Sequence, residues 1–418
     1  MSVAPPPPKV ISPEHVADPY PGLTILRDHY PVFYDEEIGS WLISRYEDVK
    51  PFLRAHGPGA SMQELIGDYL SDATFFVAMD GTDHRRRRAI LAPFFSRGGV
   101  EALEGRITDQ ARGLLEPIFE RERKAVASGE RLRGEMDFVT EFTAKFSINV
   151  MSEMLAFPEQ DYGRTHDWFK AWGAAEGNIS RDPEIFERAL WAKEDFGGYI
   201  KPIIEERKGS DGDDLISWLC RAEIEGAPLP DEEIRSIVAV MVLGGGETTD
   251  HQLAWVMREL VRHPDVQSSL QADRALLDRV LAESMRHSSI LQFSGRIPTE
   301  DVEVRGVTIE RDTPVALMLG SSNHDPRRFK DPDVFDIYRD DLAVEKAFTG
   351  SADHLGFGSG AHFCIGSHIS KAEMEIAINV FLDNVHDVRL ADGFEPRVNT
   401  EVAIVRDLPS LKLSFALN

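Results

Sequence analysis

The chain is poor in cysteine, in long hydrophobic runs and in positive charge. Its 418 residues contain two cysteines, Cys220 and Cys364. Two cysteines cannot form a disulfide framework and are too few for a zinc site without histidine partners, so we expect a reducing, cytoplasmic environment. The longest relevant apolar run, residues 237–243, is well short of the roughly 18 residues that span a membrane. The N-terminus also lacks a basic region followed by an apolar segment, which argues against a signal peptide.

Negative charge dominates the composition. The chain has 46 Lys and Arg residues against 71 Asp and Glu residues, a net charge of −25. This balance argues against general binding to nucleic acids or anionic membranes, because both need a basic surface. With 42% hydrophobic residues, the chain can bury a substantial core. Consecutive prolines at residues 5–8 predict a flexible, extended tail over residues 1–17, followed by a single domain over residues 18–418.

Hydrophobic periodicity predicts a mostly helical chain with a few short strands. Residues 41–44 are predicted as a strand followed by a helix, and residues 100–208 as helices interrupted by a loop at residues 178–183. Residues 296–309 alternate polar and apolar around a Val-Arg-Gly-Val turn, which predicts a hairpin. The C-terminal residues 400–418 are predicted as a last hairpin.

Residues 357–366 hold the feature around which the rest of the chain is organised. Cys364 lies there among nearby glycines, directly ahead of an apolar pattern with helical spacing. A cysteine at a helix N-terminus is near the positive end of the helix dipole, which favours its thiolate form. Glycines let the backbone approach a flat, bulky ligand closely. These properties suit an axial haem ligand, although a lone cysteine is more often a small buried side chain or a free thiol.

Five residues in this stretch resemble the haem-binding signature of the cytochrome P450 family. They have the spacing Phe-x-x-Gly-x-His-x-Cys-x-Gly and are Phe357, Gly360, His362, Cys364 and Gly366. The resemblance implies that haem b is the cofactor, with Cys364 as the proximal iron ligand and His362 in contact with a haem propionate. Phe357 and Gly366 would complete the cofactor-binding loop. It also implies the fold, which in this family is mainly α with small β-sheets and has a long central helix over the haem.

A run of basic residues interrupts the acidic sequence at residues 83–88. Such a run is usually a solvated helix face, but His84 and Arg88 are four residues apart and share one face of a helix. They resemble the His-x-x-x-Arg of the family, which binds a haem propionate, and a guanidinium suits a buried carboxylate. Arg296 matches the family arginine that binds the other propionate. The remaining arginines, Arg86 in particular, would form a local basic patch for an acidic electron donor.

Residues 231–263 are predicted to run through the centre of the molecule. A helix of this length spans about 50 Å at 1.5 Å per residue, yet the glycines at 244–246 would each cost roughly 1 kcal/mol relative to alanine. The stretch is either a loop between two helices or a locally opened helix that lets haem and dioxygen pack against its backbone. It resembles the family motif Gly-Gly-x-(Asp/Glu)-Thr. By that resemblance Thr248 would hydrogen-bond the activated oxygen, and Glu247 would connect it to bulk protons as a general acid.

Three further residues match structural positions of the family. Glu283 and Arg286 are three residues apart on a predicted helix, and such a pair on a surface contributes only tenths of a kcal/mol. By the resemblance they form a buried ion pair that supports the cysteine loop, with Arg339 as its third member. We therefore expect architectural rather than chemical roles for these three residues.

Alignment of the motifs also gives a set of predicted substrate contacts. They are Val240, Leu243, Gly244, Gln292, Ile404 and Val405. Most are apolar, which favours a small to medium lipophilic molecule such as a terpenoid or an aromatic compound. The alternative is a tailoring role on a polyketide or another secondary metabolite. Residues 288–293 depart from the proline-containing segment usual in the family, so this wall of the pocket does not follow from the resemblance.

The resemblance covers nearly the whole chain and implies a haem-thiolate monooxygenase. Such an enzyme inserts one oxygen atom of O₂ into an organic substrate and reduces the other to water, and the cofactor performs the hard step. Electrons would come from NAD(P)H through a ferredoxin reductase and a ferredoxin-type donor, since the chain shows no flavin or nucleotide domain. A peroxygenase and a non-catalytic haem protein, such as a sensor or electron carrier, are the alternatives. Glu247 and Thr248 argue against both.

Overall fold

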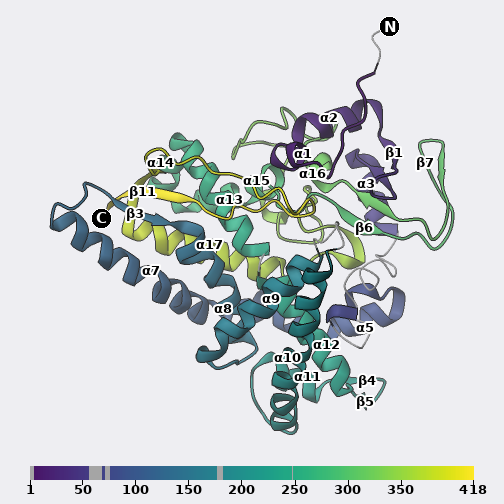
Figure 1. Ribbon diagram of the computed structural model, residues 1–418, viewed down its shortest axis with the longest axis horizontal. Coiled ribbons are helices and arrows are strands. Elements are labelled where there is room, and N and C mark those ends of the chain that lie inside the picture. Colours follow the sequence, from purple (N-terminus) through teal and green to yellow (C-terminus); the bar gives the residue numbers. More distant parts are fainter. Residues whose placement is uncertain (1–3, 56–67, 71–75, 177–181, 247) are drawn as a thin grey trace.

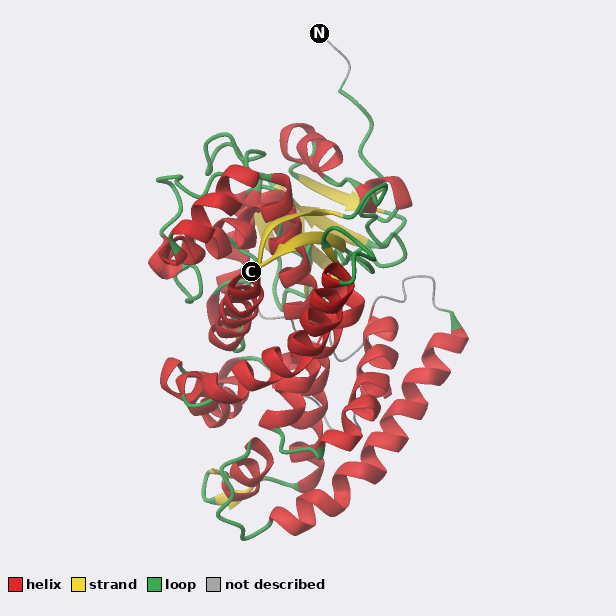
Figure 2. Cartoon of the chain, turned by 90° about the vertical axis from the view of Figure 1, so that its left-hand side faces the viewer, coloured by secondary structure: helices red, strands yellow, loops and turns green. Residues whose placement is uncertain are grey.

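The computed structural model describes residues 4–55, 68–70, 76–176, 182–246 and 248–418. Helices make up most of the molecule, and most of the strands gather in the upper part of Figure 2. The outline in Figure 1 is roughly triangular, with the long helix α7 along its lower left edge. The predicted fold class, mainly α with small β-sheets, is confirmed.

The helices follow one another along nearly the whole described chain. They are α1 (Pro13–Ala17), α2 (Tyr20–His29), α3 (Tyr46–Ala55), α4 (Asp68–Leu70), α5 (Gly81–Phe95), α6 (Arg97–Glu101), α7 (Glu104–Ala127), α8 (Ala144–Met154), α9 (Tyr162–Glu176), α10 (Pro183–Arg207), α11 (Leu215–Arg221), α12 (Asp231–Gly246), α13 (Thr248–Arg262), α14 (Pro264–Ala272), α15 (Leu277–His287), α16 (Leu319–Asn323) and α17 (Ser367–Asn384). The predicted loop at residues 178–183 lies mostly outside the described residues.

The strands of the described residues form small sheets. One sheet has the order β1 (Val32–Asp35), β2 (Ser40–Ile43), β9 (Val315–Leu317) and β6 (Ser294–Arg296). A second has the order β10 (Val385–Leu390), β11 (Lys412–Leu417) and β3 (Gly134–Asp137). Two hairpins are made by β4 (Glu223–Ile224) with β5 (Ala227–Pro228) and by β7 (Val302–Val304) with β8 (Val307–Ile309). β2 and β9 run parallel, and the other pairs run antiparallel.

The two predicted hairpins have different outcomes. The one expected within residues 296–309 is present as β7 and β8, with Arg305 and Gly306 at its tip in the left-handed region at φ 54° and 77°. The C-terminal hairpin is wrong, because β11 pairs with β10 and β3 instead. Phe415 on β11 is fully buried and packs edge-on against Phe119 of α7. The strand therefore takes the partners that let its apolar face cover the core.

The largest core cluster forms where helices from distant parts of the chain meet. α7 and α17 lie side by side, and Phe119 of α7 packs against Phe381 of α17. α13 lies near the centre of Figure 1, and all its side chains from residue 249 to residue 257 are buried. The long helical stretch predicted at residues 231–263 corresponds to α12 and α13, which lie on either side of residue 247.

The N-terminal segment differs from the predicted flexible tail. Ser12 caps the first turn of α1 with its side chain. Val10 is buried in a small apolar cluster with Leu23 of α2. Tyr30 donates its hydroxyl proton to the carbonyl of Pro5 at 2.8 Å. The described part of the tail is therefore docked, because burying apolar surface offsets the entropy of ordering the chain.

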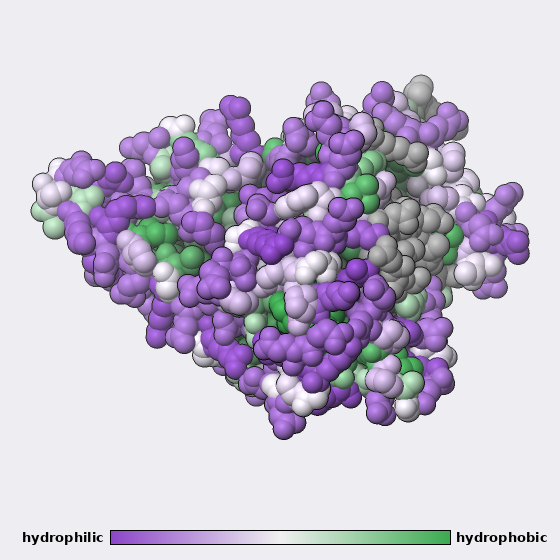
Figure 3. Space-filling model, turned by 60° about the horizontal axis from the view of Figure 1, so that its bottom comes forward, coloured by the Kyte–Doolittle hydropathy of each residue, from purple (hydrophilic) through white to green (hydrophobic). Residues whose placement is uncertain are grey.

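Apolar side chains are concentrated in the interior, where α12 and α13 meet α8. Among the described residues, no helix combines the length and apolar composition needed to cross a bilayer. The face shown in Figure 3 is mainly hydrophilic, and its hydrophobic side chains form small, separate patches.

Candidate active site

Glycines hold the loop that carries Cys364 against two helices. Gly360 has φ 79°, and a Cβ atom there would lie 2.8 Å from the Cα of Arg54 at the end of α3. A Cβ atom on Gly356 would lie 2.9 Å from the backbone oxygen of Met285 on α15. Both positions therefore require glycine, because a larger residue would displace the loop from the helices that shape it.

Cys364 lies in the turn that precedes α17. Its backbone N–H donates to the carbonyl of Phe357 at 2.9 Å, and α17 begins at Ser367, after its N-cap Gly366. Solvent reaches the sulfur although protein surrounds it on most sides. Burial raises the pKa of the thiol, and the backbone N–H of Gly366 and the charge of Arg88 lower it by less. The predicted contribution of the helix N-terminus is present, because the N–H of Gly366, the N-cap of α17, lowers the pKa, but burial outweighs it. A metal bound to the sulfur would remove the proton.

Glu283, Arg286 and Arg339 form one buried ion-pair group behind this loop. Arg286 Nη2 lies 2.7 Å from Glu283 Oε1, and Arg339 Nε lies 2.9 Å from Glu283 Oε2. Glu283 and Arg286 are completely buried, so each charge needs the other to offset the cost of removing it from water. Arg286 also donates to the carbonyl of Asn323 at 2.9 Å, and the Asn323 side chain accepts from the backbone N–H of Leu355 at 2.7 Å. The group thus fixes the segment that leads into the cysteine loop.

Four basic side chains from α5, β6 and the cysteine loop surround the same region. They are His84, Arg88, Arg296 and His362, and we call them the basic group. The rings of His84 and His362 stack with their centroids 3.9 Å apart. The charge of Arg88 acts on both histidines and on Cys364. Nε2 of His362 lies 2.9 Å from a carboxylate oxygen of Asp80, the residue that precedes α5.

The electrostatics of the basic group fit an anionic ligand. Burial, then His362 and Arg88, lowers the pKa of His84 to about 4. Burial lowers the pKa of Arg296 to about 10, and Asp80 opposes that shift. Nδ1 of His84 is buried and has no hydrogen-bond partner in the described part of the chain. Buried positive charge in excess of its counter-charge stabilises a bound carboxylate, because the alternative is an uncompensated cation.

The junction of α12 and α13 is open in the middle of a buried stretch. The helix residues on both sides are buried, whereas Gly244 and Thr248 are exposed. A Cβ atom on Gly244 would have no neighbour within 4 Å, but one on Gly246 would lie 2.9 Å from Cδ1 of Ile148. Thr248 donates its hydroxyl proton to the carbonyl of Gly244 at 3.0 Å. Glu247 lies outside the described residues. The junction therefore offers a backbone face with room for a ligand.

A buried hydrogen bond connects this junction to the helix that follows Cys364. The hydroxyl of Thr249 donates to that of Ser370 at 3.2 Å. Thr249 is in the first turn of α13, and Ser370 is in the first turn of α17. The open junction and the thiol are thus tied to the same helix end.

A sequence profile described as cytochrome P450 matches residues 31–389. The chain belongs to the cytochrome P450 family. It is 34% identical over 387 residues to pulcherriminic acid synthase of Bacillus subtilis (strain 168), over 92% of each chain. It is 29% identical over 392 residues to the cytochrome P450 monooxygenase PikC of Streptomyces venezuelae, over 90% of this chain and 86% of PikC. The structure of PksS, the cytochrome P450 of the Bacillus subtilis 168 bacillaene polyketide synthase, superposes with a TM-score of 0.82 at 26% identity, over 97% of this chain and 99% of PksS.

Members of this family are haem-thiolate monooxygenases, so this P450 is an oxidoreductase that binds haem, iron protoporphyrin IX. Its residues fit that group in three ways: a thiol that solvent reaches, a basic group with excess positive charge, and a helix junction with an open glycine face. Cys364 would hold the iron, and the basic group would hold the propionates. When bound, the haem supplies the redox chemistry.

The predicted substrate contacts of this P450 lie on two segments. Val240, Leu243 and Gly244 share one face of α12, because residues three and four apart are neighbours on a helix. Ile404 and Val405 lie in the loop before β11, where Val405 forms a bridge with the segment that follows α15.

Gln292, the sixth predicted contact, lies apart from these residues. Its side chain is buried, and Nε2 donates to the carbonyl of Ser289 at 2.9 Å. The side chain lines a small pocket with Val10 and His15 of the N-terminal segment. Its backbone N–H donates to the carbonyl of Ile404 at 2.9 Å. The position of Gln292 thus points to support of the substrate loop through its backbone.

The exposed part of the basic run on α5 is partly neutralised in this P450. Arg86 pairs with Glu225 at 2.7 Å, and Arg87 pairs with Glu233. His84 and Arg88 are turned inward, as their spacing predicts. The local basic patch expected around Arg86 is therefore weaker than the sequence run indicates.

Two residues near the site did not follow from the motifs. Asp80 was missed because its contact with His362 joins distant segments and has no local pattern. Glu373 on α17 is 2% exposed. The sequence did contain a signal for this burial: the carboxylate lies beside the helix-spaced apolar positions Ile369, Ala372 and Ile376.

Proposed function

We propose that this P450 oxidises a small to medium lipophilic secondary metabolite, by hydroxylation or epoxidation, as a tailoring step. One oxygen atom of O₂ enters the substrate, the other leaves as water, and two electrons and two protons balance the reaction. The open face at the junction of α12 and α13 carries this proposal, since Gly244 and Thr248 are accessible there beside the apolar Val240 and Leu243. A largely apolar wall with few polar groups suits a lipophilic substrate, a terpenoid or aromatic compound included.

The relatives support the same substrate class. Pulcherriminic acid synthase is named for the formation of pulcherriminic acid, and PksS is described as the cytochrome P450 of the bacillaene polyketide synthase. PikC, at a similar level of identity, is named as a monooxygenase. A tailoring role fits these three better than the oxidation of a charged primary metabolite.

Each residue of the site has its own role in this proposal. Cys364 binds the iron, and the basic group binds the haem carboxylates. The exposed hydroxyl of Thr248 exchanges its hydrogen bond to the carbonyl of Gly244 for one to a ligand bound at this open face. Glu247 supplies protons from bulk water as a general acid. Glu283, Arg286 and Arg339 hold the loop and take no part in the chemistry.

The electron supply is also part of the proposal. A ferredoxin-type donor, reduced by NAD(P)H through a ferredoxin reductase, would deliver the two electrons. Arg85, which is exposed on α5 near the inward-facing Arg88, offers this donor a cationic contact, whereas Arg86 and Arg87 are paired with carboxylates. Cys220 and Cys364 are both free thiols, which suits a reducing cytoplasm.

An absorption titration of the ferric holoprotein tests the substrate class. Lipophilic polyketide, terpenoid and aromatic compounds are added in turn, and a low- to high-spin shift would report that the compound displaces water from the iron. We expect a shift with one lipophilic class. A shift only with charged, highly polar compounds would contradict the proposal.

Two further measurements separate the alternatives. The reduced, CO-bound protein should show the thiolate-type Soret band, and a Cys364→Ser variant should lack it while Cys220→Ser retains it. Turnover driven by NAD(P)H, reductase and ferredoxin should exceed turnover driven by peroxide. The reverse order would favour a peroxygenase, and the absence of any oxygen-dependent product would favour a non-catalytic haem protein.

A further inference from the structure

Gln252 is a buried amide on α13 that the proposed mechanism does not use. It is 2% exposed and follows the exposed Thr248 by four residues. Residues four apart lie on the same side of a helix, so Gln252 is next to the open junction of α12 and α13. Burying an amide is unfavourable unless its hydrogen-bonding groups are satisfied, so the partners of Gln252 should account for its presence.

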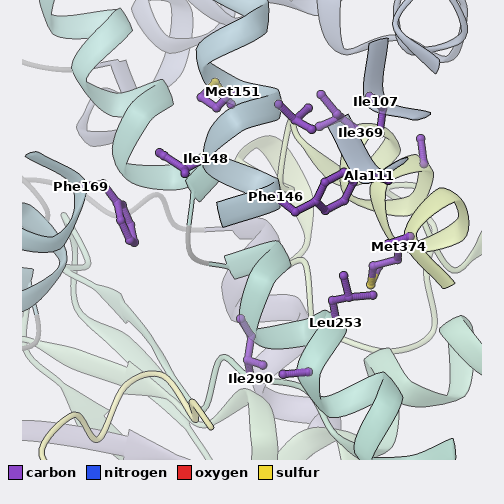
Figure 4. Close-up of a cluster of buried hydrophobic side chains, with 14 of the residues drawn as sticks. Ile107, Ala111, Phe146, Ile148, Met151, Phe169, Leu253, Ile290, Ile369 and Met374 are labelled. Carbon is purple, nitrogen blue, oxygen red and sulfur yellow. The ribbon is translucent and has the colours of Figure 1, made fainter. Parts of the chain in front are cut away.

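The partners of Gln252 lie at the end of α15 and in the segment that follows it. Nε2 donates to Oγ of Ser284 at 3.0 Å, to the carbonyl of Ser288 at 3.3 Å and, more weakly, to the carbonyl of Ser284 at 3.5 Å. Oε1 accepts from the backbone N–H of Ile290 at 3.4 Å. Figure 4 shows Ile290 in the same buried cluster as Leu253, the next residue of α13. The amide thus provides partners for backbone groups that are buried and no longer helical.

The segment that follows α15 forms a short antiparallel ribbon with the loop before β11. The N–H of Arg406 donates to the carbonyl of Ile290 at 2.9 Å. The N–H of Gln292 donates to the carbonyl of Ile404, also at 2.9 Å, and an antiparallel bridge at Val405 lies between these two bonds. We call this pair of segments the substrate ribbon, because Ile404 and Val405 are predicted substrate contacts. A contact that holds one strand of the ribbon therefore also restrains the other.

α13 holds both strands of the substrate ribbon. Gln252 binds the strand that follows α15. The indole N–H of Trp255, three residues later on α13, donates to the carbonyl of Arg406 at 3.0 Å. Residues 288–293 contain no proline, so no ring fixes the φ angles of this strand. At this end the position of the ribbon therefore depends on α13.

We propose that Gln252 is a specificity-determining residue that acts by holding the substrate ribbon in a fixed position against α13. The inference rests on the proposed function, in which Ile404 and Val405 contact the substrate. Gln252 does not touch the reacting atoms and is a positioning residue. With the ribbon fixed, the wall that a substrate meets is formed before binding, so no binding energy is lost in ordering it.

The test compares Gln252→Met with Gln267→Met in the ferric holoprotein. Methionine is close to glutamine in size but has no amide to form these hydrogen bonds. Gln267 on α14 is 7% exposed, and its side chain donates to the carbonyls of Leu260 and Val388 and accepts from the N–H of Val388. It is a matched control, because the substitution removes a similar set of buried hydrogen bonds that lead to α13 and β10 instead of the substrate ribbon.

Imidazole and 4-phenylimidazole are suitable probes, because both bind ferric haem iron through a ring nitrogen whatever the natural substrate is. The phenyl group of the larger probe extends towards the wall of the pocket. Absorption titrations give a dissociation constant for each probe. The ratio of the two constants reports the fit of the phenyl group separately from the strength of iron ligation, so a general loss of stability would leave it unchanged.

We expect Gln252→Met to raise the dissociation constant of 4-phenylimidazole roughly tenfold, which corresponds to about 1.4 kcal/mol, the contribution of a typical hydrogen bond. Its dissociation constant for imidazole, and both constants of Gln267→Met, should stay within about twofold of the wild-type values, as for substitutions away from the pocket. A wild-type ratio of the two constants in Gln252→Met, or an equal change of the ratio in Gln267→Met, would overturn the inference.

Trp255→Phe provides a second variant if Gln252→Met fails to fold. Phenylalanine keeps an aromatic ring beside the guanidinium of Arg406, whose central carbon lies 4.2 Å from the centre of the indole ring. It loses the N–H that holds the Arg406 carbonyl, so it should also weaken the binding of 4-phenylimidazole relative to imidazole. An unchanged ratio in Trp255→Phe would overturn the role of α13 in holding the ribbon, and the inference with it.

These outcomes are distinct from those that test the proposed function. A wild type that gives no spin shift with any lipophilic compound would contradict the proposed substrate class, while the expected constants for the two probes would still support the role of Gln252. Spin shifts with lipophilic compounds in the wild type, together with an unchanged ratio in Gln252→Met, would overturn the role of Gln252 alone.

Discussion

The imidazole rings of His84 and His362 stack with their centroids 3.9 Å apart. His84 lies on α5 and His362 in the cysteine loop, so this contact brings two distant segments together around the basic group. Both histidines have a lowered pKa, chiefly because burial disfavours the charged form. Neutral rings leave the positive charge of the group on Arg88 and Arg296. These two arginines are therefore the residues expected to bind carboxylates most strongly.

Replacing Arg88 by glutamine is expected to weaken haem retention. A hydrogen bond to a charged group contributes roughly 1.5–3 kcal/mol, which corresponds to about a ten- to hundredfold change. The measurement is the rate of haem transfer from the holoprotein to an excess of a haem-scavenging protein. Arg85→Gln is the control, since Arg85 lies on the same helix, is exposed and donates to Thr82. Equal rates of haem loss from the two variants would contradict the role of Arg88.

The glycines of the α12–α13 junction should differ in their response to one added methyl group. Gly246→Ala is expected to destabilise the fold by about 1–3 kcal/mol, because the new Cβ would lie 2.9 Å from Ile148. Gly244→Ala should leave stability unchanged or raise it by up to about 1 kcal/mol, since nothing lies within 4 Å and alanine favours the helix. The added methyl group of Gly244→Ala should instead weaken the binding of bulky substrates. Thermal unfolding and the spin-shift titration measure the two effects, and similar destabilisation of both variants would show that the face at Gly244 is closed.

Burial raises the pKa of Glu373 to about 8, which predicts a dependence of stability on pH. The carboxyl titrates near pH 8 in the folded chain and near its usual 4.5 when unfolded. Between these values the folded state binds more protons, so this group makes the free energy of unfolding fall as pH rises from about 4.5 to about 8. Glu373→Gln should remove that part of the slope and gain stability relative to the wild type at the alkaline end. Denaturant unfolding at several pH values measures it, and parallel curves for the two proteins would mean that Glu373 is ionised when folded.

Arg286→Met should destabilise the holoprotein strongly. The substitution leaves Glu283 completely buried without its nearest cation, and breaking a buried pair costs about 3–5 kcal/mol. Arg279→Met on the same helix is exposed and should change stability by less than about 0.5 kcal/mol. The thermal midpoints of the two variants provide the comparison. A small effect at Arg286 would mean that Arg339 alone compensates the charge of Glu283.

Features that depend on short stretches of sequence could be predicted well. The glycines around Cys364 and the three-residue spacing of Glu283 and Arg286 are local patterns, and the structure places them as that spacing requires. The same holds for His84 and Arg88, whose four-residue spacing turns both inward. The helical content of the central stretch follows from its continuous apolar periodicity.

Features that depend on which surfaces meet after folding could not be predicted. Val10 docks beside Leu23, and β11 pairs with β10 and β3, because these contacts bury apolar surface that the local sequence does not reveal. The pKa of Cys364 could not be predicted from the local sequence either. The helix N-terminus favours the thiolate, but burial by distant parts of the chain has the larger effect.

The position of Gly360 against Arg54 has a consequence for the order in which this enzyme is assembled. About 300 residues separate the two, and Met285, which presses on the same loop, is also distant in sequence. Contacts across such separations form late, because the entropy of closing a long loop is lost before the contact contributes. During synthesis α3 and α15 leave the ribosome well before the loop that they shape. The loop that carries Cys364 can therefore take its shape only after α3, α15 and the loop itself have been synthesised, so we expect haem insertion to follow the synthesis of this loop.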